Sequence, residues 1–266
     1  AGLLAPTIPP SPSKRPQPTS TSEPTERVLP TATTRLGVNA TPKPISPPTT
    51  TSTPTLAPEP TPESTVPLSS IQSITADRLG EEVMLEGRVV DTGSFSKGFQ
   101  FTLDDGTGQV VLLMWHDVYD DCWDAPKLDL DAVVRVTGEI SEYEGQLEIQ
   151  PRFGGDVEVT QEAVSQAARR DIGSITGADD GRRVMIEGRV VRTEGLSSAV
   201  KVFLADDSGE IVVFIWRNVL DRIADNTGLG TPGSLVRVVG PVQIYRANLE
   251  IVPPLPNDVT VLEMGQ

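Results

Sequence analysis

The chain has 266 residues, a net charge of −15 and 37% hydrophobic residues. Its longest apolar runs are about six residues, far below the roughly 20 that span a bilayer, so we expect no membrane span. A single cysteine, Cys122, excludes an internal disulfide framework.

The first quarter of the chain differs in composition from the rest. Residues 1–67 hold 17 of the 24 prolines, 15 threonines and 7 serines, but none of the 12 aromatic residues. Such a segment cannot fold around a core of its own, so we predict a Pro/Thr/Ser-rich extended arm or stalk. The chain begins Ala-Gly-Leu-Leu, which favours a secreted chain without its signal peptide; a chain trimmed for expression is the alternative.

Short apolar pieces interrupt the arm, and extended segments of this kind are suited to pairing with a sheet edge. We therefore predict that the arm joins subunits into a homo-oligomer or an open filament. A passive stalk, glycosylated or not, is the alternative. The predicted assembly residues are Leu3, Leu4, Ile8, Val28, Leu29, Leu36 and Val38.

An internal repeat organises the remainder. A shift of 101 residues aligns 71–121 with 172–222 without a gap, and 21 of the 51 positions are identical. An inserted residue then changes the shift to 102, so that Leu147-Glu148-Ile149 aligns with Leu249-Glu250-Ile251. A duplicated domain follows from this alignment.

Each copy is predicted to contain three strands, a short helix and two further strands. In the first copy, Gly87 marks a bulge or sharp coil in a long first strand. The predicted strands are 83–92, 99–103 and 110–115, followed by a helix at 117–124 and a hairpin of 133–139 and 146–150.

Both copies contain V-x-x-x-G-x-V, an apolar-x-L-x-D-x-x-G turn and V-x-V-x-G. In the first copy these residues are Val83, Gly87, Val89, Phe101, Leu103, Asp105, Gly108, Val134, Val136 and Gly138; in the second they are Val184, Gly188, Val190, Val202, Leu204, Asp206, Gly209, Val236, Val238 and Gly240. This pattern resembles the anticodon-binding type of OB-fold. The resemblance implies an all-β chain with two tandem five-stranded OB-type barrels, at 68–162 and 163–266. Such barrels bind nucleic acid, sugars or proteins, so the ligand stays open.

Charge separates the two copies. Residues 68–162 carry 6 basic and 20 acidic residues, a net charge of −14, whereas 163–266 carry 11 and 13. Because nucleic-acid affinity rests on Lys and Arg neutralising phosphates, nucleic-acid binding by the first barrel is not expected. Outward positions on the second strand are Gln100 and Thr102 in the first copy but Lys201 and Phe203 in the second. The predicted ligand face is Lys201, Phe203, Arg189 and Arg217.

Both third strands are apolar on both faces, which predicts burial on both sides. Trp115 and Trp216 end these strands at equivalent positions. We interpret both as core or interface residues, with a stacking platform as the alternative.

The sequence offers little for catalysis. His116 has no repeat equivalent and no catalytic motif is present, so we predict a non-enzymatic protein without cofactor or metal. Cys122 is expected to be a buried hydrophobe, with a reactive thiol as the alternative. An Asp-rich patch is interpreted as a solvated surface or one facing a basic partner; a calcium site is the alternative, although its spacing matches no EF-hand loop. The patch comprises Asp117, Asp120, Asp121, Asp124, Asp129 and Asp131.

These features favour a secreted structural protein at the cell surface, either a filament subunit or a surface module that contacts other surface proteins. The alternative function is an extracytoplasmic OB-fold binder of single-stranded nucleic acid or oligosaccharide, using the second barrel.

Overall fold

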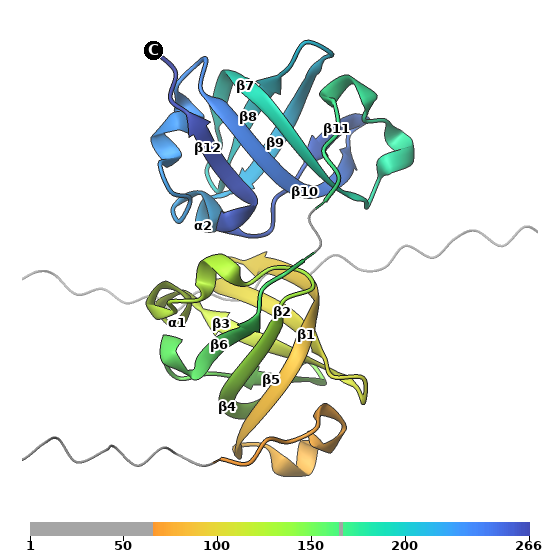
Figure 1. Ribbon diagram of the computed structural model, residues 1–266, viewed down its shortest axis with the longest axis vertical. Helices are drawn as coiled ribbons and strands as arrows, with labels where there is room; N and C mark the ends of the chain where they lie inside the picture. Colours follow the sequence, from red (N-terminus) through yellow and green to blue (C-terminus); the bar gives the residue numbers. More distant parts are fainter. Residues whose placement is uncertain (1–65, 165–166) are drawn as a thin grey trace, which may run out of the picture. The chain divides into compact units, whose positions relative to one another are not determined.

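The computed structural model describes residues 66–164 and 167–266, which form barrel 1 (66–164) and barrel 2 (167–266) (Figure 1). Barrel 1 contains β1 (Glu82–Phe95), β2 (Gly98–Asp104), β3 (Gln109–Trp115), α1 (His116–Asp121), β4 (Val133–Tyr143), β5 (Gln146–Gln150) and β6 (Val157–Gln161). Barrel 2 contains β7 (Arg183–Gly195), β8 (Ala199–Ala205), β9 (Glu210–Trp216), α2 (Arg217–Leu220), β10 (Leu235–Tyr245), β11 (Asn248–Ile251) and β12 (Val259–Glu263).

The strands of barrel 1 are hydrogen-bonded in the order β1-β2-β3-β5-β4-β6, and an additional β1–β4 pairing closes the sheet. β3 and β5 are parallel, and β1 is antiparallel to both β2 and β4. Barrel 2 repeats this connectivity with β7 to β12. The predicted fold class, all-β with two tandem OB-type barrels, is confirmed. Each sheet has a sixth strand, β6 or β12, that the sequence prediction missed.

The long first strand changes partners along its length. β1 pairs with β4 from Glu82 to Arg88, and with β2 from Arg88 onward. The register shift lies between Val89 and Asp91, so the bulge is not at Gly87. Gly87 is required for close packing instead, because a Cβ there would lie 3.1 Å from the Cβ of Leu103.

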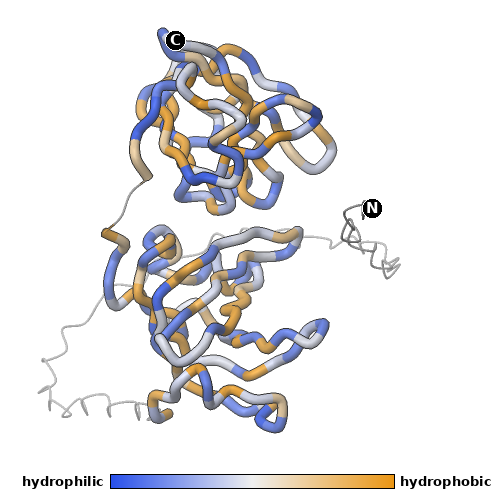
Figure 2. The backbone as a smooth tube through the Cα atoms, turned by 90° about the vertical axis from the view of Figure 1, so that its right-hand side faces the viewer, coloured by the Kyte–Doolittle hydropathy of each residue, from blue (hydrophilic) through white to orange (hydrophobic). Residues whose placement is uncertain are grey.

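Alternation along the strands places apolar side chains in each barrel interior, and Figure 2 shows the resulting mixture of hydrophobic and hydrophilic residues along the tube. On β2, Phe99 and Phe101 are fully buried whereas Gln100 is exposed, as predicted. β3 is buried on both faces, also as predicted. β9 differs, because its outward residues Phe214 and Trp216 are half-buried and exposed, respectively.

An aspartate in the turn after each second strand ties the turn to the preceding segment. Asp206 accepts hydrogen bonds from the backbone N–H groups of Ile172, Ser208 and Gly209 at 2.9, 2.7 and 3.0 Å. Burial opposes ionisation of Asp206, but these bonds outweigh it and hold its pKa at about 2. Asp105 makes the equivalent bonds in barrel 1. The D-x-x-G part of the motif is therefore structural.

Candidate functional site

The outward side of β8 and β9 in barrel 2 combines aromatic and basic residues. Lys201 and Phe203 alternate with inward-facing residues of β8, as predicted, and Phe214 and Trp216 lie on the same side of β9. The bulge in β7 between Val190 and Arg192 places Arg192 opposite Phe203. Three adjacent strands therefore contribute to one surface, which we call the barrel 2 face.

Lys201 lies within this face against two aromatic rings. Its Nζ is 5.9 Å from the ring centre of Phe214 and 5.8 Å from that of Tyr245, within the range of cation–π attraction. The same Nζ donates a hydrogen bond of 2.6 Å to Oε1 of Glu250, whose side chain is buried. Glu250 therefore neutralises the Lys201 ammonium.

Two arginines extend the same arrangement. The guanidinium carbon of Arg192 lies 3.4 Å from the ring centre of Phe203, while its Nη1 donates to Glu210 at 3.0 Å. Arg246, in the hairpin after β10, lies 5.2 Å from the Tyr245 ring. Each of the three cations in the face thus lies over an aromatic ring, the geometry that stacks with flat or cyclic ligands.

A groove with a volume of about 530 Å³ runs along this face, and Lys201, Phe203, Asn248 and Glu250 are among the residues that line it. Trp216 and Tyr245, which do not line this groove, are 42% and 51% exposed. Trp216 packs edge-on against Phe214, with ring centres 4.9 Å apart. Trp216 is therefore not a core residue, and its predicted interface role, like the alternative of a stacking platform, stays a prediction. Trp115 is half-buried, with its ring 5.6 Å from Phe95.

The repeat shows what barrel 1 has at the same positions. Gln100 and Thr102 replace Lys201 and Phe203, Asp91 replaces Arg192, Leu113 replaces Phe214, and Glu144 replaces Arg246. The aromatic residues Tyr143 and Trp115 remain. All three cations of the barrel 2 face are therefore neutral or acidic in barrel 1.

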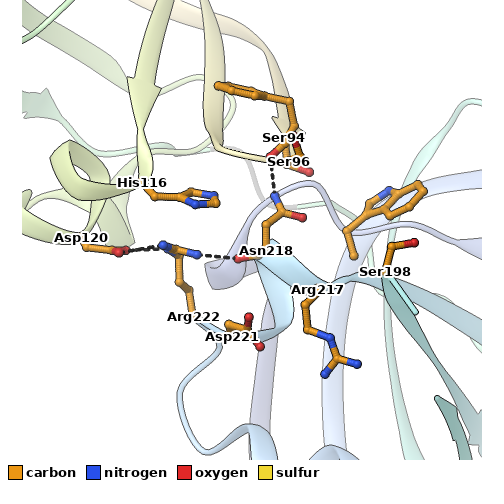
Figure 3. A pocket seen from close by; sticks show the side chains of 11 residues that line it. Ser94, Ser96, His116, Asp120, Ser198, Arg217, Asn218, Asp221 and Arg222 are labelled. Carbon is orange, nitrogen blue, oxygen red and sulfur yellow. Dashed lines mark hydrogen bonds and ion pairs between the residues drawn. The ribbon is translucent and has the colours of Figure 1, made fainter. Parts of the chain in front are cut away.

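Two of the predicted ligand residues lie elsewhere. Arg189 donates to the carbonyl oxygen of Gly233 and to Glu263, away from the groove. Arg217 begins α2 and is not among the residues that line the groove (Figure 3). The sequence prediction missed Arg192, Phe214, Tyr245, Arg246 and Glu250. Aligning the two copies for charge reversal would have found both arginines.

The other candidate residues are the single cysteine, the single histidine and the Asp-rich patch. Cys122 is buried, as predicted, and burial raises the pKa of its thiol. His116 begins α1 (Figure 3), and burial lowers the pKa of its imidazole. Asp124 accepts a hydrogen bond from the Val159 N–H and pairs with Lys127. Within residues 66–164 and 167–266, no three acidic, His or Cys side chains are grouped as metal ligands.

The predicted assembly residues of the arm all precede residue 66 and lie outside the described residues. They are Leu3, Leu4, Ile8, Val28, Leu29, Leu36 and Val38. In the part of the chain that the structure describes, no helix has both the length and the apolar character needed to cross a membrane.

The model of a family described as an OB-fold nucleic acid binding domain matches residues 83–153, from β1 through β5. Barrel 1 is an OB-fold domain. The match covers less than half of the chain, and the repeat with its identical strand order extends the OB-fold to barrel 2. The family description contrasts with the charge of −14, and the expectation that barrel 1 does not bind nucleic acid stays a prediction.

Several solved structures resemble parts of the chain. Asparaginyl-tRNA synthetase from Pyrococcus horikoshii is 24% identical over 36% of this chain and 23% of its own, with a TM-score of 0.32. The p204 HINb domain is 14% identical over 71% and 100%, with a TM-score of 0.33. A replication protein A heterotrimer bound to ssDNA is 20% identical over 33% and 60%, with a TM-score of 0.24. No curated protein matches the chain.

Proposed function

We propose that the chain binds single-stranded nucleic acid through the barrel 2 face. The observation that carries this proposal is the set of three cations, each over an aromatic ring, on the side of an OB-fold that commonly receives oligonucleotides. Exposed Trp216 and Tyr245 offer surfaces on which unpaired bases can stack. The family model of an OB-fold nucleic acid binding domain matches barrel 1, and it bears on barrel 2 only through the internal repeat.

The charges of the face indicate how such binding works. Arg192 and Lys201 are paired with Glu210 and Glu250, so attraction to phosphates is weak and stacking must supply most of the affinity. At most three cations can release counterions. We therefore expect the logarithm of the affinity to fall with the logarithm of salt with a slope no steeper than about −2.

The test is a fluorescence titration of the full chain with a short labelled oligothymidylate. Tyr245→Ala and Trp216→Ala should each weaken binding roughly 5- to 150-fold, the effect of losing one stacked base. Tyr143→Ala is the matched control, because Tyr143 is the repeat equivalent of Tyr245 and is 53% exposed. Equal losses for Tyr143→Ala and Tyr245→Ala would reject the assignment to barrel 2.

An oligosaccharide is the competing ligand, since sugar rings also stack on aromatic side chains and the face has balanced charges. A cellulose oligomer therefore serves as the second probe. Binding of this oligomer without binding of the oligonucleotide would contradict the proposal. So would preference for a double-stranded oligonucleotide, whose bases are not free to stack on the protein.

Secretion, the absence of catalysis and self-assembly through the arm stay predictions. Secretion and self-assembly rest on the composition of residues 1–67, and the absence of catalysis rests on the lack of catalytic motifs. Nucleic-acid binding by barrel 2 is compatible with each of them.

A further inference from the structure

Barrel 1 buries an acidic residue where barrel 2 buries an ion pair. Glu148 lies on the outward side of β5, beside Val111 of the parallel strand β3, and is only 7% exposed. Its Oε2 accepts one long hydrogen bond, 3.4 Å, from Nε2 of Gln150. Within the described residues no ion pair involves Glu148, and burial raises the pKa of its carboxyl group. A buried carboxylate in this situation gains from any cation that reaches it.

Barrel 2 shows which cation fits this position. Glu250 is the repeat equivalent of Glu148 and is 4% exposed, and the Lys201 ammonium lies 2.6 Å from its Oε1. The same ammonium faces Tyr245 at 5.8 Å. One copy of the duplicated domain therefore contains a complete lysine site made of a carboxylate and an aromatic ring.

Barrel 1 keeps the aromatic residue and the carboxylate at the equivalent sequence positions but lacks the lysine. Tyr143 replaces Tyr245 and Glu148 replaces Glu250, while Gln100 stands at the position of Lys201. The Gln100 amide does not take the place of the ammonium, because it lies next to Gly93. A Cβ added to Gly93 would be only 3.0 Å from Nε2 of Gln100. Because Gly93 is on β1, Gln100 lies over β1, on the side of β2 away from β3 and Glu148.

We propose that barrel 1 binds a lysine side chain of a basic partner protein, whose ammonium pairs with Glu148 as Lys201 pairs with Glu250. The net charge of −14 on residues 68–162 attracts a basic polypeptide and repels nucleic acid. This site is independent of the barrel 2 face.

The test is isothermal titration calorimetry of the full chain with a short peptide of alternating glycine and lysine. Acetylation of the lysines, which removes their charge, should abolish binding. Glu148→Gln keeps the shape of the side chain and should weaken binding roughly 10- to 100-fold, the effect of losing a hydrogen bond between charged groups. Glu144→Gln is the matched control, since it removes the same charge from an exposed position of the neighbouring hairpin and should change affinity by no more than about twofold.

A second variant tests the site by filling it. Gln100→Lys gives barrel 1 the lysine that barrel 2 has at position 201. The new side chain should pair with Glu148 and leave the barrel folded. It should reduce peptide binding as much as Glu148→Gln does. Gln72→Lys adds the same charge at an exposed position and should bind the peptide nearly as the unchanged chain does.

Three outcomes would overturn the proposal. Equal losses for Glu144→Gln and Glu148→Gln would assign the binding to the overall negative charge. If Gln100→Lys binds the peptide as tightly as the unchanged chain does, the peptide lysine does not bind at Glu148. Binding of a glucosamine oligomer without binding of the peptide would replace the protein partner with an amino sugar.

Discussion

Replacement of Asp206 by Asn should destabilise barrel 2 in a pH-dependent way. The Asp206 carboxylate has a pKa of about 2, against 3.8 for an unperturbed aspartate, because backbone N–H groups of Ile172, Ser208 and Gly209 donate to it. A shift of this size corresponds to roughly 2.5 kcal/mol, and solvent screening at a half-buried turn reduces it to about 1 to 2 kcal/mol. Asn keeps one oxygen but loses the charge that these donors favour.

The measurement is calorimetric unfolding of the full chain as a function of pH. Because the folded pKa of Asp206 is depressed, its stabilisation is fully present above the unfolded pKa and is lost as pH falls from about 4 to about 2. The difference between Asp206→Asn and the unchanged chain should therefore shrink as pH falls and disappear only below pH 2. Asp207→Asn, at the exposed neighbouring position, is the control. An Asp206→Asn variant as stable as Asp207→Asn at neutral pH would refute the reasoning.

Two further substitutions in barrel 1 have defined outcomes in thermal unfolding. Glu148→Gln should raise the free energy of unfolding at neutral pH by roughly 1 kcal/mol, because ionisation of the buried carboxyl costs stability as pH rises through its raised pKa. An equally large gain at acidic pH, where this carboxyl is protonated, would contradict the explanation. Gly154→Ala should cost roughly 1 to 3 kcal/mol, because its Cβ would lie 2.2 Å from the carbonyl carbon of Asp121, whereas Gly155→Ala meets no atom within 4 Å. Equal melting temperatures for the two alanine variants would reject the packing argument.

The framework of both barrels could be predicted because each framework residue has a local physical role. Alternation of Phe99, Gln100 and Phe101 indicated a half-buried strand, and the structure buries both phenylalanines. The D-x-x-G motif indicated a turn, and Asp206 is fixed there by backbone donors. The bulge was misplaced because Gly87 is conspicuous in sequence, whereas the register shift at Val90 depends on how β1 exchanges β4 for β2.

The binding surfaces could be predicted only in part, because they join residues that are far apart in the chain. Lys201 was recognised from strand alternation, but its partner Glu250 lies 49 residues later on β11. Tyr245 belongs to a hairpin and has no periodic signal. Arg189 was included among the ligand residues because arginines attract anions, yet it lies on another part of β7, where the Gly233 carbonyl and Glu263 engage it.

The two copies differ at the positions of the three cations. The assignment of a separate ligand to each barrel can therefore be tested by exchanging residues between them. If the cations of the barrel 2 face select nucleic acid, then Asp91→Arg, Gln100→Lys and Glu144→Arg should transfer that property to barrel 1, where Tyr143 and Trp115 already supply aromatic surface. The exchange is made in a chain whose own barrel 2 face is disabled by Trp216→Ala and Tyr245→Ala. We expect oligonucleotide binding to return and lysine-peptide binding to disappear together, because the new lysine pairs with Glu148.

Net charge is the competing explanation for any gain of binding, since the exchange makes barrel 1 less acidic and phosphates are attracted to positive charge at any position. A control chain therefore carries Gln72→Lys, Glu158→Arg and Glu162→Arg, which change the charge equally at exposed positions. Oligonucleotide binding by the control chain as tight as by the exchanged chain would show that charge alone decides the ligand. Binding by the exchanged chain alone would show that the cations act at these positions, on the same barrel as the aromatic side chains of Tyr143 and Trp115, and not through net charge.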